Sequence, residues 1–278
     1  MKNRYELAMG SIIGRGHIRL GINNQDALSV LSCDRFTVAV VCDGCGSGRH
    51  SEVGAKIGAR LVVETISKFL ESNAIVDPCD PKFWQCIHQD ILAQLQVFIK
   101  AIGGDWQQTL NDYFLFTIIG ALITPENTNI FSLGDGVILF NDCLTKLDFS
   151  GNAPPYIAYG LKYLREAREC PRELQFQIRH SRATEELNSL LIGTDGVEDL
   201  IDAAERCLPG RSDKIGSISQ FWYDDRYFQN PDKVRRKLSL INREVHQPGK
   251  PKEFGLLSDD TTLIVIRKVK NRNSNNQQ

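Results

Sequence analysis

The apolar positions of this chain follow two periods, one typical of buried strands and one typical of amphipathic helices. Short apolar runs bounded by polar turns predict strands at residues 5–13, 27–32, 36–42, 113–123, 129–133, 137–141, 144–148, 174–179, 190–194 and 261–266. Apolar residues at helical spacing predict two long helices with core-facing stripes, over 53–69 and 84–102. A short helix is expected at 197–207, and Asn230-Pro231 predicts the start of another. Loops are expected at 14–24, 151–169 and 209–230, the second of them a surface flap.

The order of these elements predicts the fold class. The short connection at 33–35 predicts an antiparallel hairpin, and turns at 125–127 and at 134–136 predict an antiparallel meander. Strands, two helices, more strands, a helix and a last strand favour an α+β fold. We expect two packed, mainly antiparallel sheets flanked by helices, an α-β-β-α sandwich. One domain is expected over residues 1–268, followed by a polar, disordered tail over 269–278.

Composition narrows the class of protein. The chain has 278 residues, of which 42% are hydrophobic and 24% charged, as in an ordinary globular protein with a sizeable core. The net charge of -1 supplies no basic field for nucleic acid or for an anionic membrane. Apolar runs stay well short of the ~20 residues that span a bilayer. The first residues lack a secretory apolar core, so we expect a cytoplasmic protein. We also expect a monomer.

Cysteine spacing argues against a disulfide scaffold or a structural zinc. The eight cysteines are scattered, which indicates reduced thiols in a chain without a secretory signal. Cys42 and Cys45 form a C-x-x-C pair, but a zinc site needs a second close pair, and Cys79 and Cys86 are too far apart. Cys42 also belongs to an apolar strand. Zinc or redox chemistry is therefore disfavoured.

The stretch 38–52, VAVVCDGCGSGRHSE, is the first candidate for chemistry. Its five uncharged residues predict a strand buried on both faces, and Asp43 follows where that strand leaves the sheet. The glycines after Asp43 permit a close approach of the backbone to a ligand, and a helix is expected from about Ser51. Such an aspartate can hold a metal or lie near a phosphate, although an aspartate in an ordinary turn has the same local pattern.

Four more aspartates lie at predicted strand ends. In an antiparallel sheet the end of one strand lies beside the start of its neighbour, so these side chains can share one rim. Several clustered carboxylates cannot all stay ionised without cations, because like charges raise each other's pKa. Oxygen ligands without His or Cys at matching spacing indicate Mg²⁺ or Mn²⁺, and two such ions are a common device for attack on phosphorus. The five positions are Asp26, Asp43, Asp135, Asp195 and Asp259.

Five motifs in sequence resemble those of the metal-dependent protein phosphatases of the 2C type, over about residues 8–267. They are NNQDA (23–27), DGCGSG (43–48), LGDG (133–136), TDGVED (194–199) and SDDTT (258–262). The chain looks most like the bacterial branch in which a His precedes Gln-Asp. The resemblance implies hydrolysis of phosphoserine or phosphothreonine on a phosphoprotein substrate, by a water that bridges two Mg or Mn ions.

The resemblance also implies roles for individual residues. Asp43 would bridge both metals, and the Gly44 carbonyl would complete one site. Asp195 and Asp259 would hold the other metal, and Asp26 would lie in the outer shell beside Gln25. Asp135 matches the position of a ligand for a third, looser metal, and Asp199 matches the second aspartate of the DGxxD motif near the same site.

Two positions depart from the pattern. Many members have an Arg in the first loop that grips the phosphate, and here His17 stands nearest that role, with Arg15 and Arg19 as rivals. Where eukaryotic members have a His after the Asp-Gly, this chain has Cys45, so the proton donor for the leaving group is unassigned. Two alternatives stay open: a phosphatase-like binding module with little or no activity, and a phosphatase of a small phosphorylated molecule.

Overall fold

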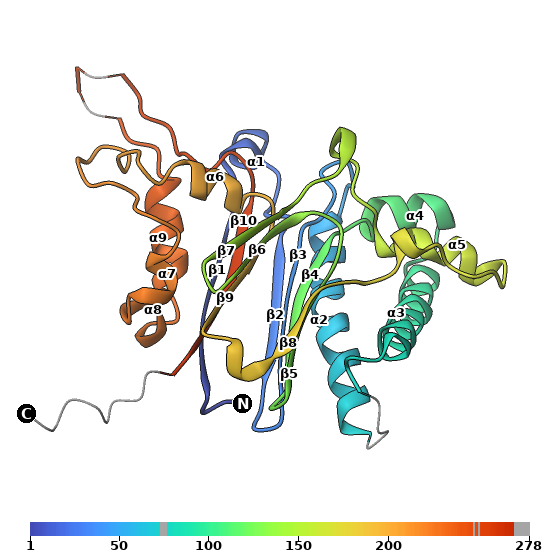
Figure 1. Ribbon diagram of the computed structural model, residues 1–278. Coiled ribbons are helices and arrows are strands. Elements are labelled where there is room, and N and C mark those ends of the chain that lie inside the picture. The colour runs from blue at the N-terminus through green and yellow to red at the C-terminus, as the bar shows by residue number, and fades with distance from the viewer. Residues whose placement is uncertain (73–76, 247, 250, 270–278) are drawn as a thin grey trace, which may run out of the picture.

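Two five-stranded antiparallel sheets form the centre of the computed structural model (Figure 1). The structure describes residues 1–72, 77–246, 248–249 and 251–269, so residues 270–278 of the expected disordered tail lie outside the described residues. The first sheet has the order β1 (Tyr5–Ile12), β10 (Thr261–Lys268), β9 (Ser189–Gly193), β6 (Gly136–Phe140) and β7 (Cys143–Leu147). The second has the order β2 (Ala27–Ser32), β3 (Thr37–Cys42), β4 (Ile118–Ile123), β5 (Asn127–Leu133) and β8 (Gln177–Ala183).

Helices cover the outer face of each sheet (Figure 1). On the second sheet lie α2 (Ser51–Glu71), α3 (Pro81–Ile102), α4 (Trp106–Tyr113) and α5 (Gly160–Arg165). On the first sheet lie α6 (Val197–Asp202), α7 (Gln220–Tyr223), α8 (Arg226–Gln229) and α9 (Lys233–Ile241). The prediction of an α+β fold with two packed antiparallel sheets between helices is confirmed. No helix in the described part of the chain combines the length and the apolar character needed to cross a membrane.

Strand β3 shows why the sheets stack in this way. Val38, Val40 and Cys42 pack into the core under α2 and α3, whereas Ala39 and Val41 pack into the core between the two sheets. Both faces of β3 are therefore apolar, which explains its unbroken apolar sequence. The hairpin of β2 and β3 is antiparallel, as predicted, and it carries Asp26 and Asp43 to one end of the sheet.

The predicted meander is wrong at the turn Gly134-Asp135-Gly136. β5 belongs to the second sheet and β6 to the first, so the chain crosses between the sheets here instead of forming a hairpin. β6 pairs with β9, and its side chains are buried on both faces: Val137 and Leu139 under the helices of the first sheet, and Ile138 between the sheets. Gly136 has a φ of +133°, and a Cβ there would lie 2.6 Å from the Gly193 carbonyl oxygen, so the crossing requires glycine.

Several element boundaries also differ from the predictions. The expected loop at 14–24 contains helix α1 (Arg15–Leu20), and the strand expected to begin at 113 begins at Ile118 instead, since Tyr113 is the last residue of α4. The helix expected at 197–207 ends at Asp202. Helix α9 begins at Lys233 because the Asn230 side chain accepts a hydrogen bond from the Asp232 amide and forms a turn.

Two expectations about which residues are buried are wrong in part. The segment 151–169 is no free flap, because Ile157, Ala158 and Leu161 are fully buried in the core under α3. The apolar stripes of the long helices are not wholly buried, since Val53, Phe98 and Ile102 are exposed near helix ends.

Candidate metal centre

The Asp43-Gly44 turn is held in place by backbone hydrogen bonds to two neighbouring segments. The Thr117 amide donates to the Asp43 carbonyl oxygen at 2.8 Å, and the Gly44 amide donates to the Gln25 carbonyl oxygen at 3.2 Å. A Cβ on Gly44 would lie 2.8 Å from that same Gln25 oxygen, so the close approach requires glycine. The position of Asp43 at the end of β3 is thus fixed by two other segments of the chain.

Asp26 is a buried carboxylate with one oxygen that lacks a partner. Only 3% of the residue is exposed, and its Oδ2 accepts a hydrogen bond from the Thr194 hydroxyl at 2.7 Å. Among the residues that the structure describes, Oδ1 has no hydrogen-bond partner. Burial raises the pKa of Asp26 well above its usual range, and the Asp260 and Asp195 carboxylates add to the effect. An unpartnered, buried carboxylate oxygen indicates that something electropositive belongs nearby.

An open cavity of about 300 Å³ is lined by several carboxylates, and three of them act electrostatically on Asp43, which does not itself line the cavity. Asp135 reaches it from the crossing between the sheets, Asp195 from the end of β9, and Asp259 from the segment before β10. The remaining lining residues are Asp148, Gly196, Glu198, Asp199 and Ser258. The predicted rim of aspartates is therefore built from the ends of two stacked sheets and not from one.

Asp148 and Glu198 were not identified from the sequence. Glu198 lies within the TDGVED motif and forms an ion pair with Lys146 of β7 at 2.6 Å. Asp148 directly follows β7, so its place at a strand end was the available signal. Asp199, which the motif did indicate, accepts a hydrogen bond from the Ser258 amide at 2.7 Å and holds the segment that carries Asp259.

The carboxylates act on one another electrostatically. Burial raises the pKa of Asp43 well above its usual range, and the charges of Asp26, Asp195, Asp259 and Asp135 raise it further. Burial and the Asp259 and Asp135 charges raise the pKa of Asp195 to about 7. Burial is also the main cause that raises the pKa of Asp135 to about 6. A set of oxygen ligands that cannot all be ionised together fits hard divalent cations such as Mg²⁺ or Mn²⁺.

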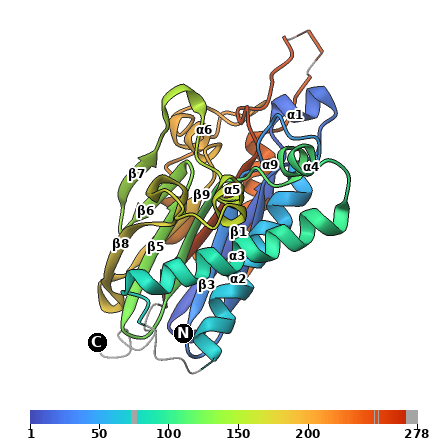
Figure 2. The ribbon, with the colours of Figure 1, turned by 90° about the vertical axis from the view of Figure 1, so that its right-hand side faces the viewer.

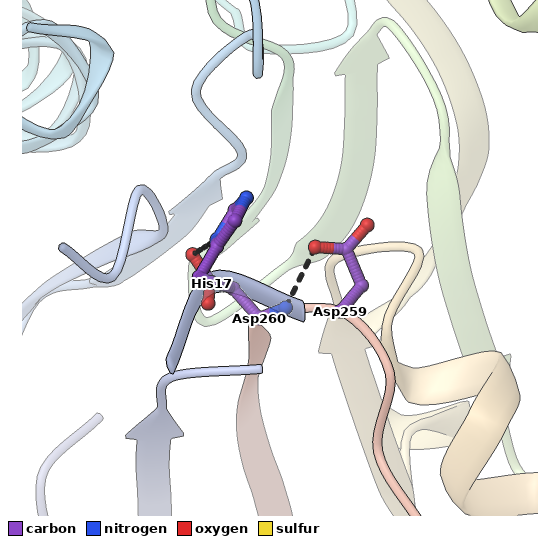
Figure 3. A group of neighbouring side chains, drawn as sticks. All are labelled: His17, Asp259 and Asp260. Carbon is purple, nitrogen blue, oxygen red and sulfur yellow. Dashed lines mark hydrogen bonds and ion pairs between the residues drawn. The ribbon is translucent and has the colours of Figure 1, made fainter. Parts of the chain in front are cut away.

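His17, Asp259 and Asp260 form the tightest group of possible metal ligands in the described part of the chain (Figure 3). One ligand atom from each lies within 4.8 Å of the others. The Nδ1 atom of His17 is 2.9 Å from Asp260 Oδ2, and the Asp260 amide donates to Asp259 Oδ1 at 2.8 Å. Figure 3 shows His17 beside Asp260, with Asp259 to their right and hydrogen-bonded to the Asp260 amide.

Asp260 is already engaged by the backbone of the first loop. Its Oδ1 accepts from the Gly14 amide and its Oδ2 from the Gln25 amide, both at 2.6 Å. With His17 also in contact, Asp260 is suited to position the first loop and less suited to bind a metal. Sequence reasoning missed this role, and the only signal was a second aspartate in SDDTT.

The rival side chains of the first loop face elsewhere. Arg15 donates from Nη1 to the Gly255 carbonyl oxygen at 2.9 Å, and the Arg19 guanidinium lies 4.6 Å from the centre of the Phe254 ring. Both arginines thus contact the segment before Asp259. Of the three candidates, His17 is the one whose side chain contacts an acidic residue of the SDDTT motif.

Cys45 is a half-buried thiol at the edge of the centre. Its Sγ lies 3.2 Å from the Ser47 hydroxyl oxygen. Burial opposes ionisation of Cys45, but hydrogen bonds from Ser47 and Tyr156 outweigh it and lower the pKa of the thiol. Cys42 is fully buried, and both cysteines are free thiols. Tyr156 belongs to the segment expected as a flap, so that segment contacts the loop after Asp43.

Comparison with known proteins finds one matching family and several similar structures. The family described as protein phosphatase 2C matches residues 13–221. A search of curated protein sequences found no significant match. A bacterial serine phosphatase is similar in structure, with 14% identity, a TM-score of 0.52 and coverage of 96% of this chain and 99% of the other. At this identity the likeness shows the fold.

Two further solved structures agree with this fold. Serine/threonine phosphatase Stp1 from Staphylococcus aureus has 12% identity and a TM-score of 0.51, with coverage of 96% of this chain and 95% of the other. The catalytic domain of serine threonine protein phosphatase PstP, in complex with two manganese ions, has 16% identity and a TM-score of 0.50, with coverage of 96% and 99%.

Proposed function

The chain belongs to the protein phosphatase 2C family, and from this premise we propose that it hydrolyses phosphoserine or phosphothreonine on a protein with Mg²⁺ or Mn²⁺. The observation that carries the proposal is that carboxylates from four other segments lie close enough to raise the pKa of Asp43. Asp43 has its pKa raised by Asp26, Asp135, Asp195 and Asp259 in addition to burial. Such a group of acids destabilises the protein unless cations bind, so a role in binding cations explains it.

The residues divide into those that would hold metal and those that would support them. Asp43, the Gly44 carbonyl, Asp195 and Asp259 would hold two ions, with Asp26 in the outer shell. Asp135 would hold a third, more loosely. The ions would stabilise the charge on the phosphoryl group and lower the pKa of the attacking water.

His17 is proposed to contact the phosphate. Its ring is 18% exposed, and Asp260 holds one nitrogen, so the other ring nitrogen remains available to a ligand. This contact with the Asp260 carboxylate holds the ring in its orientation. Residues 1–268 are proposed to work as one unit, since β1 pairs with β10 along eight residue pairs and Asp260 bonds to Gly14.

An assay of metal-dependent turnover tests the proposal. The wild-type protein should hydrolyse p-nitrophenyl phosphate with Mn²⁺, lose activity in EDTA and regain it when Mn²⁺ is restored. Asp43→Asn should abolish turnover and leave the circular dichroism spectrum unchanged. Glu71→Gln, the same carboxylate-to-amide change at an exposed position, should retain turnover. Turnover in Asp43→Asn, or turnover indifferent to EDTA, would contradict the proposal.

Substrate class needs a second measurement. A library of peptides with phosphoserine, phosphothreonine or phosphotyrosine should show turnover of the first two. Release of phosphate from small phosphorylated molecules alone would instead support a metabolite phosphatase. Mn²⁺ binding by calorimetry, without turnover of any of these, would support a phosphatase-like binding module.

A further inference from the structure

Lys146 of β7 holds a positive charge against the wall of the acidic cavity. Its Nζ atom lies 2.6 Å from the Oε2 atom of Glu198, which belongs to α6 and lines the cavity. Figure 2 shows β7 at the outer edge of the first sheet, beyond β6. Lys146 has no part in the function proposed above. Surface ion pairs contribute little to stability by themselves, so the importance of this one depends on what Glu198 does.

Glu198 is within electrostatic reach of two residues proposed to hold metal. Burial is the main cause that raises the pKa of Asp195, and the Glu198 charge is among those that add to the effect. Burial likewise raises the pKa of Asp135, and Asp148 and Glu198 are the neighbouring charges that contribute. An unpaired Glu198 would therefore make the potential at both aspartates more negative.

The ammonium group of Lys146 offsets the charge of Glu198 in the metal-free protein. None of the eight described residues that line the cavity is basic, so Lys146 supplies a positive charge that the wall itself lacks. The hydrogen bond to Glu198 and the charge of Glu198 raise the pKa of Lys146, with further contributions from Asp202 and Asp148. Carboxylates that share a cavity repel each other less when one of them is paired. Lys146 thus favours the folded state when metal is absent.

The same pairing opposes the binding of metal. A divalent ion at the proposed centre is repelled by the Lys146 ammonium and attracted by each carboxylate that stays unpaired. The ammonium also occupies an oxygen of Glu198, a residue that lines the same cavity as Asp135, the proposed ligand of the loosely bound ion. Lysine and metal therefore compete for the negative charge of one cavity.

We propose that Lys146 is a built-in counter-cation, which stabilises the metal-free protein and weakens the binding of divalent ions in the cavity through Glu198. This role rests on the metal centre proposed above and adds a control on its affinity. Loss of the Lys146 charge should change two quantities in opposite directions: the stability of the metal-free protein falls, and its affinity for metal rises. A lysine that only supported the fold would change stability without tightening metal binding.

Calorimetric titration of Mn²⁺ into the metal-free full chain tests this role. Lys146→Met keeps an unbranched side chain and removes the charge. At low ionic strength its dissociation constant for Mn²⁺ should be about three- to tenfold lower than that of the wild type, which is the effect of one charge on a divalent ion across roughly 6–10 Å of water. The difference should shrink in about 0.5 M salt, because salt screens the interaction. The melting temperature of the metal-free variant should fall.

Three further variants separate charge from structure. Lys146→Arg keeps the charge, so its affinity for Mn²⁺ should stay within about twofold of the wild-type value. Glu198→Gln leaves the Lys146 ammonium unpaired beside the cavity and should weaken Mn²⁺ binding. Lys252→Met breaks an ion pair of the same length, 2.6 Å to Glu244, and neither of these residues lines the cavity. Its affinity should also stay within about twofold of the wild-type value.

The outcomes distinguish the role of Lys146 from the metal centre itself. Unchanged or weaker Mn²⁺ binding by Lys146→Met would overturn the role of Lys146, and so would equal tightening by Lys252→Met. Either result leaves the metal centre intact, since the wild-type protein still binds Mn²⁺. A wild-type protein that binds no Mn²⁺ would overturn the metal centre and the role of Lys146 with it.

Discussion

The Nδ1 atom of His17 lies 2.9 Å from the Oδ2 atom of Asp260, and this contact joins the first loop of the chain to its last strand. The same carboxylate accepts from the amides of Gly14 and Gln25, so the residues at both ends of the first loop are held by one side chain. Because Asp259 and Asp26 are the immediate neighbours of Asp260 and Gln25, the position of Asp260 controls the position of two proposed metal-site residues.

Asp260→Asn should weaken both stability and turnover. The Asp260 carboxylate has two acceptor oxygens, one for the Gly14 amide and one for the Gln25 amide and His17. Asparagine has one acceptor oxygen and an NH₂ donor, so one of the two backbone N–H groups would face a donor. We expect a loss of about 1–3 kcal/mol in the free energy of unfolding. We also expect turnover to fall roughly 10–100-fold, as for other residues that orient ligands. Urea denaturation and a Mn²⁺-dependent phosphatase assay measure the two effects.

A control for this variant is available within the same cavity. Asp148 is exposed and lines the cavity, so Asp148→Asn should change the free energy of unfolding by less than about 0.5 kcal/mol. Equal destabilisation by the two variants would show that Asp260 has no special structural role.

The stability of the metal-free protein should fall as pH rises from 5 to 8. Burial and neighbouring charges raise the pKa of Asp195 to about 7 and that of Asp135 to about 6. Both values lie above those of the unfolded chain, so the folded protein binds more protons in this range and is stabilised by them at low pH. As pH rises through the folded values, these protons leave and the stabilisation is lost. Melting temperatures in EDTA measure the effect.

Metal should reverse the direction of this dependence. Divalent cations displace the protons, so the increase in melting temperature caused by Mn²⁺ should grow from pH 5 to pH 8. A melting temperature in EDTA that increases over this range would contradict the raised pKa values of Asp135 and Asp195.

Cys45 should be alkylated faster than the exposed cysteines at neutral pH. Its pKa is lowered because hydrogen bonds from Ser47 and Tyr156 outweigh the effect of burial, so a larger fraction is thiolate. Treatment with limiting iodoacetamide at pH 7, followed by peptide mass spectrometry, should show labelling at Cys45 several-fold ahead of Cys143. The fully buried Cys42 serves as the unreactive reference. Slower labelling of Cys45 than of Cys143 would refute the prediction.

Substitution of Arg267 should destabilise the folded protein more than substitution of an exposed charged residue. It is buried, and its guanidinium bonds to Glu6, to Asp225 and to the Trp222 carbonyl oxygen. Lysine lacks the planar fork needed for three such partners, so Arg267→Lys should lower the free energy of unfolding by about 1–3 kcal/mol.

An exposed arginine gives the control for Arg267. Arg35 lies 3.9 Å from Glu71 on the surface, and Arg35→Lys should cost no more than about 0.5 kcal/mol. Chemical denaturation of both variants tests the contrast, and similar values for the two would count against a structural role of the buried arginine.

Much of the fold was predictable because its signals are local. The unbroken apolar run before Asp43 indicated a strand buried on both faces, and β3 packs in that way. The crossing at Asp135 was not predictable, since Asp-Gly is equally a hairpin pattern and only the pairing of β6 with β9 distinguishes the two outcomes. Helix α4 was missed because its apolar residues are few, and the apolar residues that follow Tyr113 lead into β4 and resemble the start of a strand.

The sequence by itself determined the chemical character of the protein: buried strands, a set of aspartates at strand ends, and motifs of one phosphatase family. These follow from residue type and spacing over a few positions. The tertiary structure alone decided which carboxylates accept hydrogen bonds and which stay free for a ligand. Asp260 and Gly14 are 246 residues apart, and Asp26 and Thr194 are 168 apart. Hydrogen bonds depend on separations of about 3 Å, which only the packing of the two sheets can set.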